Sequence, residues 1–260
     1  MAEKIQVKNL SIYIILITYF LITLILPIIC TAFEAAFLIF VYHGSLFSTG
    51  ILWYWLGAKS ILKKNNIRFL KSNEYPLLQN YISKTIEDLK LRIKVKVAVL
   101  DEALPNAFTL FLSPKKYLIV FSIGLFENLE FNEIKAVITH ELFHIKNKDV
   151  WIKSLFIVGR FLWFPTGPIL ESYISRSRET QADLESSFLT KDPYSLATAL
   201  IKMVKCYISK PDLTFKMSNI SKSFWIVDNK YKKDKNFIKK ILSRHPSTES
   251  RVKKLIKMNI

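Results

Sequence analysis

Hydrophobic positions along the chain gather first in one long block, residues 10–57, in which Glu34 is the only acidic residue and no Lys or Arg occurs. A membrane-spanning helix needs about 20 apolar residues, so the block is long enough for two helices and a tight turn, which we place near Cys30 to Glu34. A signal peptide is the alternative, but its apolar core spans only about 7–15 residues and is followed by a small-residue cleavage site. We therefore predict an uncleaved transmembrane helical hairpin.

After this block the pattern becomes that of a folded domain. Residues 74–91 carry a polar face with Pro76 in the first turn, which predicts a helix. Alternation in residues 93–100 predicts a strand, and the apolar runs 107–112 and 117–121 predict a hairpin around the turn 113–116. The fold class expected is α+β, with a mainly helical domain and a small β-sheet over residues 58–260. The hairpin at 10–57 and a short N-terminal segment, 1–9, precede it.

Further helices are predicted from their start signals and periodicity: 132–148 with Asn132 as its cap, 169–189, one starting at Asp192-Pro193, and 248–258. Residues 150–164 are apolar but carry Lys153 and Arg160 on one helical face, and they stop at a Pro165 to Pro168 breaker. This segment is too short and too charged to span a bilayer comfortably. A buried core helix and a membrane-surface helix both remain open for it.

The formal net charge of +17 lies outside the apolar block, and five basic residues crowd directly after it: Lys59, Lys63, Lys64, Arg68 and Lys71. The turn between the two predicted helices has none, so the positive-inside rule places both chain ends in the cytoplasm. A basic domain beside a bilayer attracts anionic lipid head groups. Nucleic acid is the rival partner, but the chain shows no zinc-finger spacing, RNA-binding strand motif or basic-aromatic ladder.

Cysteine usage fits this placement. The chain has only two cysteines, Cys30 within the apolar block and Cys206 far away in the sequence. A disulfide framework is thereby excluded, and a reducing compartment is consistent with the sequence. We expect a multi-pass protein of the cell membrane with its domain in the cytoplasm.

The strongest chemical signal is the stretch THELFHIKNKD, residues 139–149. On a helix, His140 and His144 stack on one face, so both imidazoles can reach one metal ion. Glu141 lies one position round the helix, where its carboxylate can take a proton from a water molecule beside the metal. Two neutral nitrogens and one further oxygen ligand favour zinc, which lowers the pKa of water to about 7.

A third ligand is available in the segment 176–183, RSRETQAD. Glu179 and Asp183 are four positions apart on a predicted helix, so one can bind the metal while the other accepts the spare N–H of a ligating histidine. The alternative is a solvated acidic face paired with Arg176 and Arg178.

Four patches in order along the chain resemble the HtpX-like membrane metallopeptidases, relatives of the CAAX prenyl endopeptidases with a gluzincin-type catalytic domain. These are LPNAF at 104–108, HELFH at 140–144 with its trailing Asp149, SRSRETQAD at 175–183 and RHPSTESR at 244–251. Together they cover the chain from about residue 90 onward.

The resemblance implies roles for particular residues. One Zn²⁺ per chain would be held by His140, His144 and Glu179, with Glu141 as the general base. His245 would lie near the metal and stabilise the oxyanion, and Asp183 would support a ligating histidine. The edge strand to which a substrate adds would begin at Asn106, Ala107 and Phe108.

Spacing is the departure from this pattern. HtpX-type members place two further membrane helices between the second histidine and the glutamate, whereas His144 and Glu179 are only 35 positions apart here. The short interval argues against the usual intramembrane chamber and against a prenyl-peptidase role.

Two polar residues need separate comment. Asp149 closes the zinc helix, where an acid opposes the helix macrodipole, so we expect a specific partner, a basic group that holds the helix in place. His43 lies inside the apolar block, and we expect a polar contact within the membrane for it.

The sequence therefore predicts a zinc endopeptidase that cleaves unfolded or membrane-derived polypeptides. A signal transducer resembling the β-lactam-sensing receptor metallopeptidases is a second hypothesis, and the absence of a sensor domain after the catalytic region speaks against it. A third is a non-catalytic, basic protein of the membrane surface with a structural metal, and an intact Glu141 speaks against that.

Overall fold

A computed structural model describes residues 67–71, 73–113, 115–153, 166–209 and 246–258, with 17–18, 20–21, 23, 37, 39–49 and 51–52 of the apolar block. Residues 39–49 are helical, and His43 Nδ1 lies 2.8 Å from the Ile39 carbonyl of the same helix. The predicted turn at 30–34 lies outside the described residues, as does most of the predicted hairpin. None of the described helices is both long enough and apolar enough to cross a bilayer.

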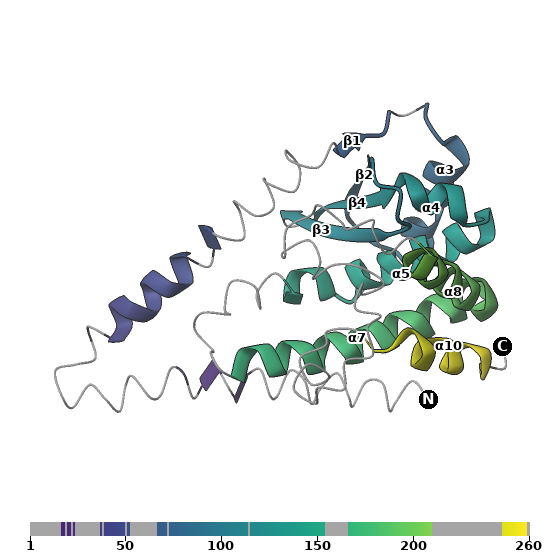
Figure 1. Ribbon diagram of the computed structural model, residues 1–260. Coiled ribbons are helices and arrows are strands. Elements are labelled where there is room, and N and C mark those ends of the chain that lie inside the picture. The colour runs from purple at the N-terminus through teal and green to yellow at the C-terminus, as the bar shows by residue number, and fades with distance from the viewer. Residues whose placement is uncertain are drawn as a thin grey trace.

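A four-stranded mixed sheet forms one layer of the domain (Figure 1). Its order is β1 (Ile67–Phe69), β2 (Lys94–Leu100), β4 (Lys116–Ser122) and β3 (Ala107–Ser113). The β-hairpin predicted for residues 107–112 and 117–121 is confirmed, because β3 and β4 pair antiparallel. Strand β2 pairs parallel with β4. Among the described strands β3 has a single neighbour, which makes it an edge strand.

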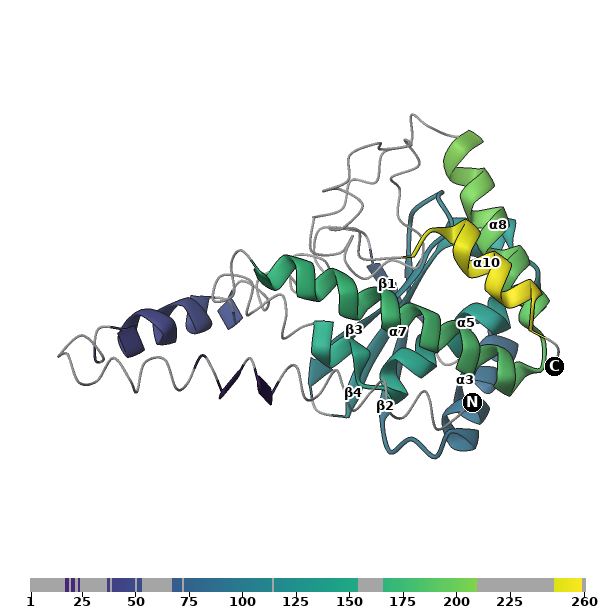
Figure 2. The same cartoon turned by 90° about the horizontal axis from the view of Figure 1, so that it is seen from below.

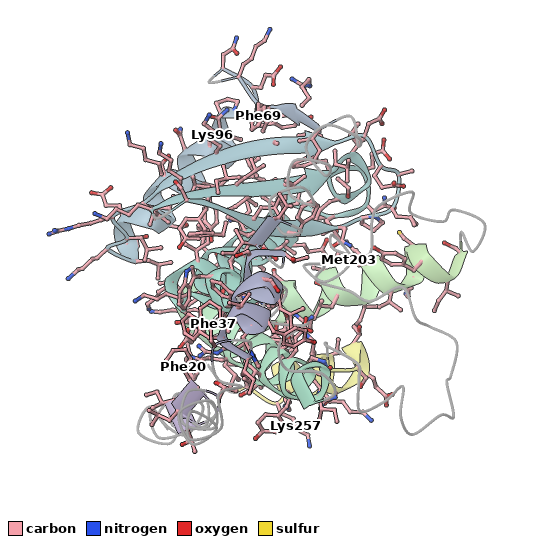
Figure 3. All side chains as sticks on the ribbon, turned by 90° about the vertical axis from the view of Figure 1, so that its left-hand side faces the viewer. Phe20, Phe37, Phe69, Lys96, Met203 and Lys257 are labelled. Carbon is pink, nitrogen blue, oxygen red and sulfur yellow. The ribbon has the colours of Figure 1, made fainter. Side chains whose placement is uncertain are left out.

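Strand β4 is the centre of the sheet, and its sequence explains why. Leu118, Ile119, Val120 and Phe121 are all fully buried. A continuous apolar run of this kind suits a strand that is covered on both faces rather than on one. At the outer rim of the sheet the side chains are exposed or half-buried, and Figure 3 shows Phe69 and Lys96 there, with the Lys96 ammonium 5.6 Å from the Phe69 ring centre.

Helix α5 (Phe131–Lys146) lies below the sheet in the view of Figure 1, which Figure 2 shows from underneath, and it is buried nearly all round. It contacts β3 on one side and α3 (Pro76–Asp88), α7 (Thr166–Thr190) and α8 (Pro193–Ser209) on others. A helix enclosed on every side must be apolar or internally paired around its whole circumference. Five polar residues of α5 therefore sit in the interior of the domain, where each needs a partner: Glu133, Thr139, His140, Glu141 and His144.

Helix α5 begins slightly earlier than predicted. Its cap is Glu130 rather than Asn132, because the Glu130 backbone N–H donates to the Glu133 carboxylate at 2.8 Å in a capping box. Glu133 is also bound by Lys202 of α8 at 2.9 Å. A reciprocal cap that is also an ion pair is favoured over the exposed Asn132 amide two residues later.

The remaining helices follow the predicted order. Helix α7 begins at Thr166, within the predicted breaker, and Pro168 is tolerated there because a helix leaves its first N–H groups unpaired. Helix α8 begins at Pro193 as predicted, and the Ser195 N–H donates to Asp192 at 2.9 Å. Helix α10 (Thr248–Ile256) is capped by Ser247, and the short α4 (Ile123–Asn128) follows β4 directly.

Residues 149–153 are helical again after a break at Asn147 and Lys148, where Lys148 has a φ of 59°. Val150 and Ile152 are buried, whereas Trp151 is 45% exposed. The described start of this segment thus packs one face into the domain. Residues 154–165, and with them the choice between a core helix and a membrane-surface helix, lie outside the described part of the chain.

Gly124 allows α4 to approach the loop that leads into β3. A Cβ atom at this position would lie 2.0 Å from the Ala103 carbonyl oxygen and 2.9 Å from the Leu104 carbonyl carbon. The Gly124 N–H also donates to the Glu102 carbonyl at 2.9 Å, which holds the two backbones together. Since backbone atoms cannot swing aside, a side chain here must displace the loop.

We therefore expect Gly124→Ala to destabilise the domain by at least about 1–3 kcal/mol, the usual cost of overpacking, which the small gain in helix propensity does not offset. Thermal unfolding of the detergent-solubilised protein measures it. Gly44→Ala is the control, because nothing lies within 4 Å of its added methyl group. Equal transitions for the two variants would show that the loop yields freely.

Candidate metal centre

The two histidines of α5 turn their rings toward one point. His140 Nε2 and His144 Nε2 are 3.1 Å apart, and both side chains are buried. The one-turn spacing on the helix produces this directly, because residues four apart stack along one face. The sequence thus brings two nitrogen ligands together without help from the rest of the fold.

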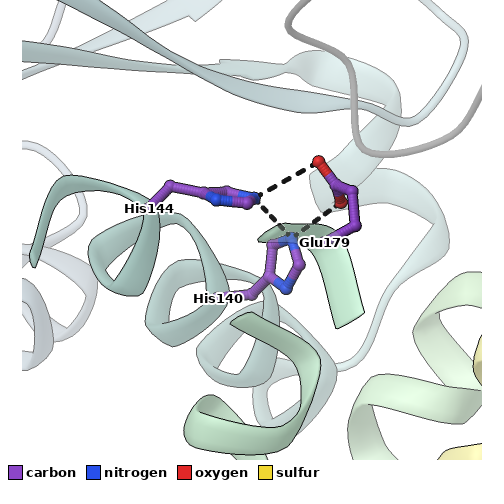
Figure 4. A group of neighbouring side chains, drawn as sticks. All are labelled: His140, His144 and Glu179. Atoms are coloured by element: carbon purple, nitrogen blue, oxygen red, sulfur yellow. Dashed lines mark hydrogen bonds and ion pairs between the residues drawn. The ribbon is translucent and has the colours of Figure 1, made fainter. Parts of the chain in front are cut away.

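Glu179 of α7 lies opposite them, where its carboxylate could supply an oxygen ligand. Its Oε2 lies 3.5 Å from His140 Nε2, and its Oε1 lies 3.5 Å from His144 Nε2. Figure 4 shows the two carboxylate oxygens turned toward different histidines. In a tetrahedral zinc site, bonds of about 2.0–2.1 Å put neighbouring ligand atoms roughly 3.3 Å apart. The three donor groups therefore fit a zinc ion, and they form a possible metal site among the described residues.

Asp149 has the specific partner that its position predicts. Its Oδ2 lies 2.9 Å from His144 Nδ1, and its Oδ1 lies 3.1 Å from a guanidinium nitrogen of Arg178 on α7. All three side chains are buried. Asp149 therefore orients His144 and, through Arg178, links this histidine of α5 to the helix that carries Glu179.

Asp183 plays the matching part for the other histidine. Its Oδ1 is 3.1 Å from His140 Nδ1, as the spacing of Glu179 and Asp183 allows. Arg251 of α10 holds the same carboxylate with two bonds, Nε to Oδ2 at 2.8 Å and Nη2 to Oδ1 at 2.7 Å. Burial alone would raise the pKa of Asp183, but the Arg251 guanidinium and His140 outweigh it and lower that pKa. Asp183 is thereby kept as a carboxylate.

The electrostatic field at the histidines favours a cation. Burial and the Lys153 ammonium both lower the pKa of His144, but the carboxylates of Glu179 and Asp149 outweigh them and raise that pKa to about 9. The carboxylates that stabilise a proton here also stabilise a divalent ion.

Glu141 points to the sheet side of α5. The hydroxyl of Thr109, on β3, donates to Glu141 Oε2 at 2.6 Å, and both side chains are buried. Charge-assisted bonds of this length are among the stronger hydrogen bonds in proteins. The proposed base is thus held by the edge strand itself.

The residues predicted to start the substrate strand are in place but are occupied structurally. Asn106 donates from Nδ2 to the Tyr207 hydroxyl at 3.1 Å, and its Oδ1 accepts from the Ala107 N–H at 2.8 Å. Asn106, Ala107 and Phe108 are all buried. A direct role in binding substrate stays a prediction for them. His245 lies outside the described residues, so its predicted role stays open as well.

Four residues at this site were not assigned a role from the sequence: Thr109, Lys153, Arg178 and Arg251. Arg178 and Arg251 do lie inside the patches that carry the family resemblance, and Arg178 appeared only as a partner for a solvated face. Thr109 is a polar residue in an otherwise apolar strand, which is a weak signal. Lys153 is a charged residue in an apolar segment, and its Nζ lies 3.1 Å from Glu179 Oε1.

The comparisons with known proteins agree with this geometry. The model of peptidase family M48 matches residues 73–167 and 160–259. The protease HtpX homolog of Methanocaldococcus jannaschii is 27% identical over 245 residues, covering 80% of this chain and 84% of that relative. The protease HtpX homolog of Dictyoglomus turgidum is 26% identical over 294 residues, covering 95% and 91%.

A solved structure shares the fold. The crystal structure of S. mikatae Ste24p superposes with a TM-score of 0.54 at 20% sequence identity, covering 97% of this chain and 66% of that one. At this identity the likeness speaks for architecture alone. The match to the family spans well over half of the chain and includes every described residue of the metal centre, and the chain therefore belongs to peptidase family M48, as an HtpX-like metallopeptidase.

Proposed function

We propose that this protein is a membrane-anchored zinc endopeptidase that hydrolyses peptide bonds in unfolded or membrane-derived polypeptides, a quality-control role. One observation carries the proposal: Glu141 lies on the same buried helix as the two histidines that converge with Glu179. A purely structural zinc site does not need a carboxylate base beside its ligands. This favours a catalytic centre over the non-catalytic alternative.

The chain's own residues divide the chemistry among them. Zinc, when bound by His140, His144 and Glu179, supplies a Lewis acid that polarises the scissile carbonyl and acidifies water. His144 keeps its proton on Nδ1, facing Asp149, and His140 keeps its proton on Nδ1, facing Asp183. Each Nε2 lone pair is thereby directed at the metal position.

Glu141 acts as the general base. Its carboxylate takes a proton from the attacking water and returns it to the leaving amine. The Thr109 bond fixes Oε2, so the carboxylate cannot rotate freely on the helix. His245 is proposed to lie near the metal and to stabilise the oxyanion of the tetrahedral intermediate.

The substrate is proposed to bind as an extended strand along the open edge of β3. Main-chain hydrogen bonds would give most of the affinity, so sequence selectivity should be low. The chain offers such an edge because β3 pairs only with β4 among the described strands. Thr109 places this edge next to the proposed base.

Membrane anchoring is proposed for residues 10–57. Phe20 and Phe37 in this block are 59% and 75% exposed, which suits lipid contact better than water. In the domain, Lys94 and Lys116 are direct neighbours in the β2–β4 register. Like charges opposite one another destabilise a sheet. Anionic lipid head groups would relieve this repulsion, so we include them among the partners.

The base is tested first. Glu141→Gln should retain near-stoichiometric zinc and lose cleavage of casein by about 100-fold or more, because the ligands are unchanged while the proton acceptor is gone. Zinc is measured by metal analysis and cleavage by fluorescence of labelled casein. Glu87→Gln, an exposed position on α3, is the matched control. Cleavage at the wild-type rate by Glu141→Gln would refute the mechanism.

The ligand and its neighbour are separated by a second pair of variants. Glu179→Ala should lose most bound zinc, whereas Asp183→Asn should bind it about 10–100-fold more weakly, because the three ligands remain while the support of His140 and the ion pair with Arg251 are weakened. Asparagine keeps the shape of the side chain beside Arg251. Glu185→Ala, on the same helix but bonded to Asn147 and Gln181, serves as control in zinc competition titrations. Wild-type zinc affinity in both variants would place the metal elsewhere.

Orientation in the membrane is tested by thiol labelling, in a background with Cys30 and Cys206 replaced by serine. The basic residues after Gly57 predict a cytoplasmic domain. A cysteine introduced at Thr31 should react with an impermeant maleimide on intact cells, and one at Ser221 should react only after permeabilisation. The reverse pattern would contradict the cytoplasmic placement.

A further inference from the structure

Lys153 is a largely buried cation that the mechanism above does not use. Its side chain is only 11% exposed, and its Nζ lies 3.1 Å from Glu179 Oε1. It follows the buried residues Val150 and Ile152 on the helical turns after the zinc helix. A lysine is costly to bury unless it is paired, so its direction toward Glu179 is a constraint of the fold rather than a chance surface contact.

The oxygen that Lys153 contacts is a predicted ligand atom. Glu179 Oε1 is also the atom that lies 3.5 Å from His144 Nε2. The second oxygen, Oε2, lies 3.5 Å from Arg251 Nη1. Each oxygen of the metal-binding carboxylate therefore faces a positively charged side chain as well as a histidine.

Two positive charges beside one carboxylate have opposite effects on a metal site. They hold the carboxylate in place, which favours binding, and they draw its charge away from the metal and repel a divalent ion, which opposes binding. Arg251 already fixes Glu179 from the side of Asp183, so the orienting contribution of Lys153 is partly redundant. The electrostatic contribution is not redundant, because charges in a buried site are poorly screened.

We propose that Lys153 acts on the metal through Glu179. Its ammonium competes with the metal for this carboxylate and so holds zinc affinity below what the three ligands alone would give. A metal ion whose charge is less neutralised by its ligands is a stronger Lewis acid. Lys153 would therefore lower zinc affinity and raise the reactivity of the bound ion. This inference rests on the proposed function, because it takes His140, His144 and Glu179 as zinc ligands.

The experiment measures zinc affinity directly, on full-length protein stripped with a chelator and titrated against a chromophoric zinc competitor. Lys153→Met removes the charge and keeps an apolar stem of similar length. It should bind zinc about tenfold more tightly or better, in the range by which residues that contact metal ligands usually change affinity, and should show a lower kcat for casein at saturating zinc. Lys153→Arg keeps the charge and should stay close to the wild-type affinity.

Lys153→Gln is the second neutral variant, chosen because its polar side chain suits a site at the rim of the core should the methionine variant misfold. Lys253→Met is the matched control, since it removes the same charge from an exposed pair with Glu249 on α10. Tighter zinc binding by the neutral variants alone supports the proposal. Unchanged or weaker zinc binding in them overturns it.

Failure of the proposed function gives a different result in the same titration. If wild-type protein and a His140→Ala variant bind zinc equally, the metal is not at this site, and the zinc mechanism fails together with the inference on Lys153. If the wild type binds at the site and the neutral variants bind no more tightly, only the inference on Lys153 fails.

Discussion

The domain depends on the pairing of charges that are buried around one helix. Four carboxylates near the two histidines are almost inaccessible to solvent: Glu141, Asp149, Glu179 and Asp183. Removing one partner from a buried ion pair typically costs about 3–5 kcal/mol, because a charge is left without compensation. Each of these carboxylates has a donor from another element, and the helices can therefore dock in only one arrangement.

This requirement explains why the helices below the sheet pack as they do. Arg178 bonds Asp149, which joins α7 to the end of α5, and Arg251 bonds Asp183, which joins α10 to α7. Thr109 bonds Glu141 and joins the sheet to α5. The contacts that position the ligands are thus also the contacts between layers. Structural stability and the geometry of the centre cannot be varied separately here.

The sequence predicts what is local, and the limits of that prediction are physical. The stacking of His140 and His144 follows from helix periodicity, and the β3–β4 hairpin follows from two apolar runs on either side of a turn. Long-range bonds do not follow from periodicity, because they depend on how finished elements dock. Arg251 and Asp183 are 68 positions apart, and Thr109 and Glu141 are 32 apart. Asn132 was predicted as the cap of α5 in place of Glu130. The capping box at Glu130 also binds Lys202, which lies on a helix far along the chain.

The bond between Arg251 and Asp183 has a consequence for synthesis. Asp183 leaves the ribosome 68 residues before its partner, and at about 5–20 residues per second this interval lasts roughly 3–14 s. Through that time α7 carries the carboxylates of Asp183 and Glu179 without the Arg251 guanidinium that pairs with them in the finished domain. The metal centre of a nascent chain is therefore electrostatically incomplete until α10 has been made, and a protease whose own unfolded segments are still emerging beside it acquires its finished active site last.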